Sequence, residues 1–463
     1  MRRWRTTGRW VLIAALLACG TLIAAEAWRR HNLYWYDVRQ DYAYDFAPAS
    51  ASWAPVDLST AGFELPQQAV GSGTALLELQ VTATPAGWWL EPCLEISVGD
   101  LQEAQCFERG AKGRRYVLLP PTQAGGSTSL RLRGHHLEWR AQEARVVWFT
   151  APPLEGTRVL VLAPHPDDAE IASFGLYASN EAYVATMTAG NYVDGLYGGL
   201  GLDTQAQDLL RGEVRVWDSL VVPQLGGVAP TRTVNLGYQT YTLKGFHDTA
   251  RESTSAAPGG PLGTYRQGAV EGLLGGRPAT ADWASVVADL IALIHSIRPD
   301  VIVTPHPALD DHTDHQYTTI ALLEALEAVQ DRSTTLLLYN NHHRLSEHYP
   351  YGPSTALMTL PPWFGGTRFA AVYSHRLDER EQLRKLFALE AMHDLRAPPL
   401  RLETGAPTGV LLQRLRQAAD VVRRDPFGDY SYFRRAVRPN ELFFVYPPEA
   451  RPSAAEIVAP LKR

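Results

Sequence analysis

The feature that most constrains the fold is an apolar strand that ends directly in charged residues. Val159–Ala163 form a continuous apolar run, and Pro164 is followed by His165, Asp167 and Asp168. Such a run is typical of a strand covered on both faces, as in a parallel sheet with helices on each side. Two adjacent carboxylates at the end of this strand repel each other and are costly to bury. We therefore expect a cation among these side chains.

Strands and helices alternate along the chain after Gly156. A helical stretch from Glu170 precedes an apolar strand over Tyr183–Met187, and apolar residues at helical spacing over Trp283–Ile297 precede a second buried strand over Val301–Thr304. This alternation predicts an α/β domain with a Rossmann-like, mostly parallel sheet. Ligands bind open α/β sheets at the carboxyl ends of the strands, so the ends of both strands are candidate site positions.

The second buried strand leads into another cluster of histidine and aspartate, TPHPALDDHTDHQYTT. It contains Asp310, His312, Asp314 and His315, and one helical turn would place the two histidines on the same face. A polar turn with an N-cap explains one aspartate in each cluster but not the surplus. Histidine combined with carboxylate suits an ion such as Zn²⁺. The two clusters therefore predict a metal site shared between two strand ends.

The two clusters also resemble the motifs of a known enzyme family. PHPDDAE and RPDVIVTPHPALDDHTDH look like those of the PIG-L/LmbE-like family of zinc-dependent deacetylases, which remove acetyl groups from N-acetylglucosamine in glycoconjugates. Weaker matches are TAGN, LLRGEVRVW, KLFALEAMHDL and NELFF. The resemblance covers residues from about 156 to 447 and implies the fold and activity of that family for this range.

The resemblance implies roles for individual residues. The implied zinc ligands are His165, Asp168 and His315. Asp167 corresponds to the general base that takes a proton from water. His312 corresponds to the group that stabilises the oxyanion or protonates the leaving amine. A bound metal would also relieve the charge repulsion between the adjacent aspartates.

Other positions near these motifs are informative. The resemblance implies that Asp314 tunes His312 and that Arg211 contacts substrate, although an exposed helix arginine is an equally simple interpretation of Arg211. Relatives commonly carry an Asp-Gly pair near the place where Thr240 and Tyr241 stand here, which puts the usual sugar contact in doubt. Gly245–Thr280 is rich in Gly, Pro and Ser and favours a long loop.

The first thirty residues indicate targeting. Four arginines precede an apolar run from Trp10 to Ala25, and charged residues follow it. The run through Trp28 is near the lower length limit for crossing a hydrocarbon core of roughly 30 Å, and the arginines favour an N-terminus inside the cell. We expect an uncleaved single-pass anchor in a bacterial inner membrane, with the catalytic part in the periplasm. A signal cleaved at the AEA pattern, or a lipoprotein box ending at Cys19, is less favoured.

The segment between the anchor and residue 150 has the composition of β-structure. Short runs rich in Val, Leu and aromatic residues, separated by Gly and Pro, favour a small antiparallel sandwich. These runs are Ala75–Thr82, Trp88–Val98, Tyr116–Leu119, Leu130–Leu132 and Ala144–Phe149. The pair Trp88 and Trp89 fits either a sugar-stacking surface or ordinary strand residues. Cys93 and Cys106 lie in adjacent runs, so an oxidising compartment predicts a disulfide, and two buried thiols are the alternative.

The predicted organisation has four parts. These are a basic stub and anchor over residues 1–30, a β-sandwich over 31–150, a deacetylase domain over 151–448 and a tail over 449–463. A net charge of −6 provides no basic field for nucleic acid. The expected function is a hydrolase, dependent on Zn²⁺ or another divalent ion, that removes N-acetyl groups from amino sugars of an envelope polysaccharide or glycolipid. The alternatives are an amidase for another acylated amine and a non-catalytic component that binds or assembles glycans.

Overall fold

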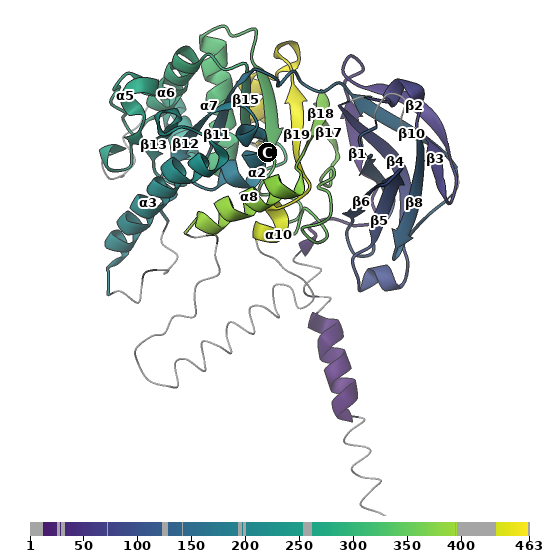
Figure 1. Cartoon of the computed structure of the whole chain (residues 1–463). Coiled ribbons are helices and arrows are strands. Elements are labelled where there is room, and N and C mark those ends of the chain that lie inside the picture. Colours follow the sequence, from purple (N-terminus) through teal and green to yellow (C-terminus); the bar gives the residue numbers. More distant parts are fainter. Residues whose placement is uncertain are drawn as a thin grey trace, which may run out of the picture.

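The computed structural model describes residues 13–25, 28, 33–71, 73–122, 128–140, 142–192, 197, 201–252, 262–393, 395 and 432–461. These residues form a unit of helices around one large sheet, with an antiparallel β unit beside it (Figure 1). The predicted mixed α/β fold is confirmed.

The β unit consists of two antiparallel sheets. Its strands are β2 (Ser52–Leu58), β3 (Gly62–Glu64), β4 (Thr74–Ala83), β5 (Cys93–Val98), β6 (Leu101–Cys106), β7 (Lys112–Leu118), β8 (Ser129–His135), β9 (Leu137–Trp139) and β10 (Gln142–Phe149). One sheet has the order β2-β10-β4-β7, with β9 paired to β4, and the other has the order β3-β8-β5-β6. Leu79 of β4 and Ile96 of β5 belong to one apolar core, so the two sheets pack on each other.

The predicted strand over Trp88–Val98 is wrong in its first half. Ala86–Trp88 form a 3-10 turn, and β5 begins only at Cys93. Pro92 has no N–H to donate to a neighbouring strand, so the extended run cannot pair before it. Trp88 and Trp89 therefore lie outside the sheets, and both are exposed.

Strands β5 and β6 form a hairpin that aligns two cysteines. The hairpin turns at Gly99, whose φ of +57° is readily adopted only by glycine. Cys93 lies directly opposite Cys106 in the register of the two strands. The predicted disulfide between them is confirmed.

The α/β unit is built on an eight-stranded sheet. In spatial order its strands are β14 (Gln267–Gly268), β13 (Thr233–Tyr238), β12 (Glu181–Thr188), β11 (Arg158–Ala163), β15 (Val301–Pro305), β16 (Thr335–Tyr339), β19 (Asn440–Tyr446) and β18 (Ala371–Arg376). The five neighbouring strands β13, β12, β11, β15 and β16 are parallel to one another. The remaining strands, β14, β19 and β18, pair antiparallel. The strands predicted over Tyr183–Met187 and Val301–Thr304 lie within β12 and β15.

Helices surround this sheet (Figure 1). They are α2 (Asp168–Ala178), α3 (Thr204–Val221), α4 (Leu243–Glu252), α5 (Val270–Leu274), α6 (Trp283–Ile297), α7 (Thr313–Ala328), α8 (Glu379–Ala391), α10 (Tyr432–Ala436) and α11 (Ala454–Leu461). The chain moves from β11 to β12 and β13 in one direction across the sheet, and from β13 to β15 and β16 in the other. Because crossovers between parallel strands are right-handed, α2 and α3 lie on one face of the sheet and α6 and α7 lie on the other.

The prediction of one long loop over Gly245–Thr280 is wrong. The described part of this range includes most of α4 as well as β14 and α5. Leu243, Phe246 and His247 are buried at helical spacing, and His247 packs against Tyr317 of α7. This apolar stripe stabilises α4 despite the nearby glycines and prolines.

The β unit and the α/β unit share a hydrophobic core. Strand β1 (Ala43–Phe46) pairs in parallel with β17 (Phe364–Phe369), which is more than 300 residues later in the chain. Along β4, Leu77 faces the core between the two antiparallel sheets, and Leu76 faces the core of the α/β unit. The sheet that contains β4 is therefore a middle layer, buried on both faces.

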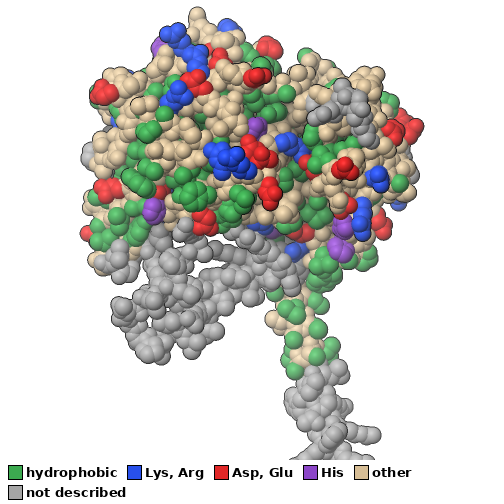
Figure 2. Space-filling model, viewed as in Figure 1, with side chains coloured by type: hydrophobic (Ala, Val, Ile, Leu, Met, Phe, Trp, Pro, Cys, Tyr) green, Lys and Arg blue, Asp and Glu red, His purple; other side chains and the backbone are tan. Residues whose placement is uncertain are grey.

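Residues 13–25 are helical and project from the body of the protein, with hydrophobic side chains on their surface (Figure 2). Leu16 and Leu17 are each more than 60% exposed. The remainder of the predicted anchor, including residues 10–12 and 26–27, lies outside the described residues. Within the described part of the chain, no helix has the length and apolar character needed to cross a membrane.

Candidate metal centre

The candidate site lies where the strand order of the large sheet reverses. From β11 the chain passes outward through β12 and β13, and it then returns to β15 on the other side of β11. Loops that leave the carboxyl ends of two such strands diverge and open a crevice. The first loop, His165–Asp168, follows β11 and ends at the first residue of α2. The second loop, His306–His315, follows β15 and includes the first turn of α7. The structure brings the two predicted clusters together.

Three donor atoms from these loops converge on one point. His165 Nδ1 lies 3.3 Å from Asp168 Oδ2 and 3.2 Å from His315 Nε2. His315 Nε2 lies 3.0 Å from the same Asp168 oxygen. Ligand atoms bound at about 2.1 Å to a tetrahedral Zn²⁺ are roughly 3.4 Å apart, so these separations approach those of a zinc site. These are the three residues that the family resemblance implies as zinc ligands, and the structure brings them together.

The first loop is shaped by its own backbone. The N–H groups of Asp167 and Asp168 both donate to the His165 carbonyl oxygen, and the His165 N–H donates to Asp168 Oδ2. Asp168 is also the first residue of α2, where the helix dipole favours a carboxylate. This tight turn aims the histidine and the second aspartate at the same point.

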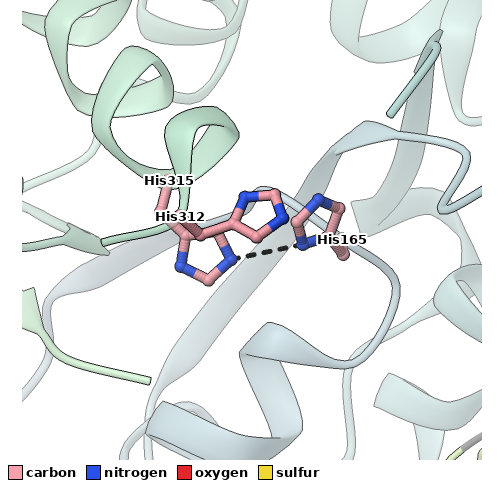
Figure 3. A group of neighbouring side chains, drawn as sticks. All are labelled: His165, His312 and His315. Carbon is pink, nitrogen blue, oxygen red and sulfur yellow. Dashed lines mark hydrogen bonds between the residues drawn. The ribbon is translucent and has the colours of Figure 1, made fainter. Parts of the chain in front are cut away.

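The surrounding histidines offer two overlapping groups that can bind a metal ion. One is His165, His312 and His315, and the other is Asp168, His315 and His342. Figure 3 shows the first group, with a dashed line joining His315 to His165. His315 belongs to both groups. The donor atoms of His165, Asp168 and His315 lie within 3.3 Å of one another, so these three residues are the candidate ligands.

Two further carboxylates orient the ligand histidines. Asp314 Oδ2 lies 3.2 Å from His165 Nε2, and Asp310 Oδ2 lies 3.0 Å from His315 Nδ1. Each contact turns the opposite ring nitrogen toward the cluster, as is common in metal sites. The resemblance implies that Asp314 tunes His312: its charge raises the pKa of His312 against burial, and its carboxylate also contacts His165. Asp310 belongs to the second predicted cluster, but the sequence indicated no individual role for it.

The charges of the cluster favour a divalent cation. Burial opposes protonation of both ligand histidines, yet Asp168 and Asp314 raise the pKa of His165, and Asp168 and Asp310 raise that of His315. Against its own burial, the pKa of Asp168 is lowered by the same histidines. The three buried carboxylates thus favour positive charge at this point, and a divalent ion would supply it. Spacing, donor types and charge all fit Zn²⁺.

Asp167 lies beside the three ligands but is not one of the converging donors. Its side chain is 14% exposed, compared with 2% for Asp168. Its Oδ1 forms an ion pair with Arg215 Nη2 at 3.0 Å, and Arg215 Nη1 donates to the Gly190 carbonyl oxygen. No sequence pattern had indicated a role for Arg215. It lies one helical turn after Arg211 in the LLRGEVRVW motif, and this spacing is a signal that could have identified it.

His312 lies at the N-cap of α7 and faces the ligand His165. The two ring centres are 4.5 Å apart. Burial, together with the neighbouring His165 and His315, lowers the pKa of His312 to about 3. Its Nδ1 accepts the Asp314 backbone N–H at 3.2 Å, so the neutral ring carries its proton on Nε2.

The rim of the site is aromatic. The Tyr241 ring stacks on His312 with a centre-to-centre distance of 4.9 Å, and Tyr192 meets Tyr241 at 5.5 Å. Arg211 Nη1 donates to the Tyr192 carbonyl oxygen at 2.6 Å, which places the predicted substrate-binding arginine beside this rim. The backbone N–H of Thr240 donates to Asn191 Oδ1.

A family of known proteins matches the part of the chain that contains both loops. Residues 160–326 match the PIG-L family, described as GlcNAc-PI de-N-acetylase. The family resemblance is confirmed for these residues, which we call the PIG-L segment. A search of curated proteins found no match.

Solved structures give more distant likenesses. The zinc-inhibited form of teicoplanin deacetylase Orf2 has 18% identity and a TM-score of 0.32, covering 63% of this chain and 98% of that one. The 4-carboxy-2-hydroxymuconate hydratase GalB from Pseudomonas putida has 12% identity and a TM-score of 0.31, covering 62% and 95%. TM-scores this low support no conclusion about function. The functional proposal below therefore rests on the PIG-L segment and on the geometry of the site.

Proposed function

We propose that the protein is a zinc-dependent hydrolase that removes N-acetyl groups from N-acetylated amino sugars. The convergence of His165, Asp168 and His315 beside the more exposed Asp167 is the observation that carries this proposal. The match of residues 160–326 to a family described as GlcNAc-PI de-N-acetylase supports the substrate class.

The residues have complementary roles in hydrolysis. His165, Asp168 and His315 would hold the metal, which when bound supplies Lewis acidity that acidifies water and polarises the amide carbonyl. Asp167 accepts the proton of the attacking water, because it is the accessible carboxylate next to the ligands. Arg215 holds Asp167 in place through the ion pair with Oδ1.

His312 acts on the amide oxygen. Because its pKa is lowered to about 3, the ring is neutral at pH 7 and its Nε2–H is a hydrogen-bond donor. This favours oxyanion stabilisation, one of the two roles that the family resemblance implies, over donation of a proton by an imidazolium. The proton that Asp167 accepted passes to the leaving nitrogen as the C–N bond breaks, which yields acetate and a free amine.

The activity is tested by measuring acetate release. Full-length protein is incubated with Zn²⁺ and a panel of acetylated amino-sugar oligomers. We expect release that stops after chelation and in His315→Ala but persists in His295→Ala, a matched change at an exposed histidine on α6. Acetate release only from acylated amines that lack a sugar would contradict the proposal.

We further propose that the substrate is an envelope polysaccharide or glycolipid, and that an inner-membrane anchor holds the catalytic part in the periplasm. Four arginines before the apolar run and the Cys93–Cys106 disulfide support export. Mass spectrometry of the native protein should find the disulfide intact in the membrane fraction. Free thiols in a cytosolic pool would contradict this location.

A further inference from the structure

Two tyrosines form an aromatic corner at the rim of the metal centre. Tyr192 follows β12 and Tyr241 follows β13, so both come from the carboxyl end of the sheet. Their rings meet at 71°, and each side chain remains more than half exposed. The exposed faces of the two rings thus form a corner, and one of these rings, that of Tyr241, stacks on His312.

The backbone of Tyr241 is held in an unfavourable conformation that directs its side chain to this place. Its φ is +65°, a region that residues with a Cβ rarely adopt. The Tyr241 N–H donates to Asp314 Oδ2 at 2.6 Å, and the same oxygen contacts the ligand His165. The position of the aromatic ring is therefore linked to the metal ligands through one carboxylate. Strained residues held in this way concentrate at binding and catalytic sites.

We propose that Tyr241 and Tyr192 bind the pyranose ring that carries the scissile N-acetyl group. This inference rests on the proposed de-N-acetylase function, because it names what holds the sugar while His312 contacts the amide. A pyranose presents an apolar C–H face, and an aromatic ring offers a rigid surface for such a face with little loss of side-chain freedom. Arg211, bonded to the Tyr192 carbonyl oxygen, lies beside this surface as a donor for sugar hydroxyls.

The geometry also explains why this pair is preferred to the other exposed aromatic pair. Trp88 and Trp89 lie in the turn before β5 of the β unit. Tyr241 instead stacks directly on the group that contacts the amide. A sugar bound at this corner has its N-acetyl group next to His312. A sugar bound at the two tryptophans would lie on the β unit.

The test measures binding separately from catalysis. Calorimetry follows an N-acetylglucosamine tetramer titrated into zinc-loaded Asp167→Asn protein, in which turnover is suppressed. We expect Tyr241→Ala to weaken binding about 10-fold or more, Tyr192→Ala to weaken it less, and Tyr241→Phe to remain within about 2-fold, because the ring rather than the hydroxyl makes the contact. Phe387→Ala, a change at an exposed aromatic residue of α8, is the control and should have no effect.

Kinetics with the natural Asp167 distinguish binding from positioning of His312. Tyr241→Ala should raise KM about 10-fold for the tetramer with kcat within about 3-fold, and it should not change hydrolysis of a small N-acetyl amine that has no sugar. An unchanged tetramer affinity, or an equal loss of kcat on both substrates, would overturn the inference. If no substrate releases acetate but Tyr241→Ala still weakens tetramer binding about 10-fold, the proposed function fails, and only sugar binding by the two tyrosines stands.

Discussion

The two loops that meet at the metal centre contribute in different ways. The first loop, His165–Asp168, places two of the three converging donors and Asp167 within four residues. The second loop, His306–His315, provides one donor, His315, together with Asp310 and Asp314, which orient the ligand rings. One loop therefore mainly supplies donors, and the other mainly fixes their direction.

The comparison shows how differently the two loops depend on the rest of the fold. The first loop is closed by its own backbone hydrogen bonds. In the second loop, Asp310 Oδ2 accepts the backbone N–H groups of Asn341 and His342, which follow β16. Asn341 Nδ2 in turn donates to Asp168 Oδ1 at 2.7 Å. The segment after β16 thus connects the two loops.

The largest effect is expected where the loops act together. Changing His165, Asp168 or His315 to Ala should abolish zinc retention and acetate release, because each change removes a donor and leaves two. Zinc content after dialysis is measured by mass spectrometry, with His295→Ala as the control. Stoichiometric zinc in all three variants would refute the shared site.

The next effect separates catalysis from metal binding within the first loop. Asp167→Asn should keep zinc and substrate affinity but lower kcat by roughly 10² or more, because the amide cannot accept the proton of water. Steady-state kinetics and zinc content are measured on the same preparation. Loss of zinc would make Asp167 a ligand, and a full kcat would place the base elsewhere.

A smaller effect tests the orienting role of the second loop. Asp310→Asn and Asp314→Asn should each weaken zinc binding by about 10- to 100-fold, since the ligand rings lose a carboxylate partner. Asp310→Asn should have the larger effect, because Asp310 also binds the segment after β16. Competition with a zinc chelator measures both Kd values. Equal affinity in wild type and both variants would show that ring orientation does not depend on these carboxylates.

The second loop should also make stability sensitive to acid. His306 is buried against Phe369 and Phe444, and burial lowers its pKa from 6.5 to about 3. Below pH 6.5 the unfolded chain binds a proton that the folded protein does not, so this contribution is complete above pH 6.5 and declines as pH falls toward 3. The loss at pH 5 should be about 2 kcal/mol.

Urea unfolding of wild type and His306→Phe at pH 7 and pH 5 measures this loss. The variant keeps an aromatic ring in the same surroundings but cannot titrate, so its free energy of unfolding should fall less between the two pH values. His295→Ala controls for an exposed histidine. The same pH dependence in wild type and His306→Phe would contradict the assignment to His306.

Sequence patterns predicted the elements and donors that depend on local order. The apolar run over Val159–Ala163 and the adjacent HPDD motif contain the strand, the turn and two of the three ligands that the resemblance implies. Likewise, Cys93 and Cys106 are symmetrically placed about the turn at Gly99, so their pairing follows from a hairpin.

Features that depend on tertiary contacts were not predicted. Asp310, Arg215 and Tyr241 acquire their roles from partners on other strands or loops, and a single sequence does not specify those contacts. The pairing of β1 with β17 could not be predicted from the sequence either, because most of the chain separates the two strands. Local composition wrongly predicted a loop over Gly245–Thr280. Helix α4 forms there because burial of its apolar stripe outweighs the effect of the nearby glycine and proline residues.

Both loops should hold one and the same ion. Anomalous diffraction at the zinc edge, from crystals of the zinc-loaded protein, shows where the ion is bound. We expect one strong peak at about 2.0–2.2 Å from His165 Nδ1, Asp168 Oδ2 and His315 Nε2. A peak bound by residues of one loop alone, or by Asp168, His315 and His342 without His165, would contradict this expectation.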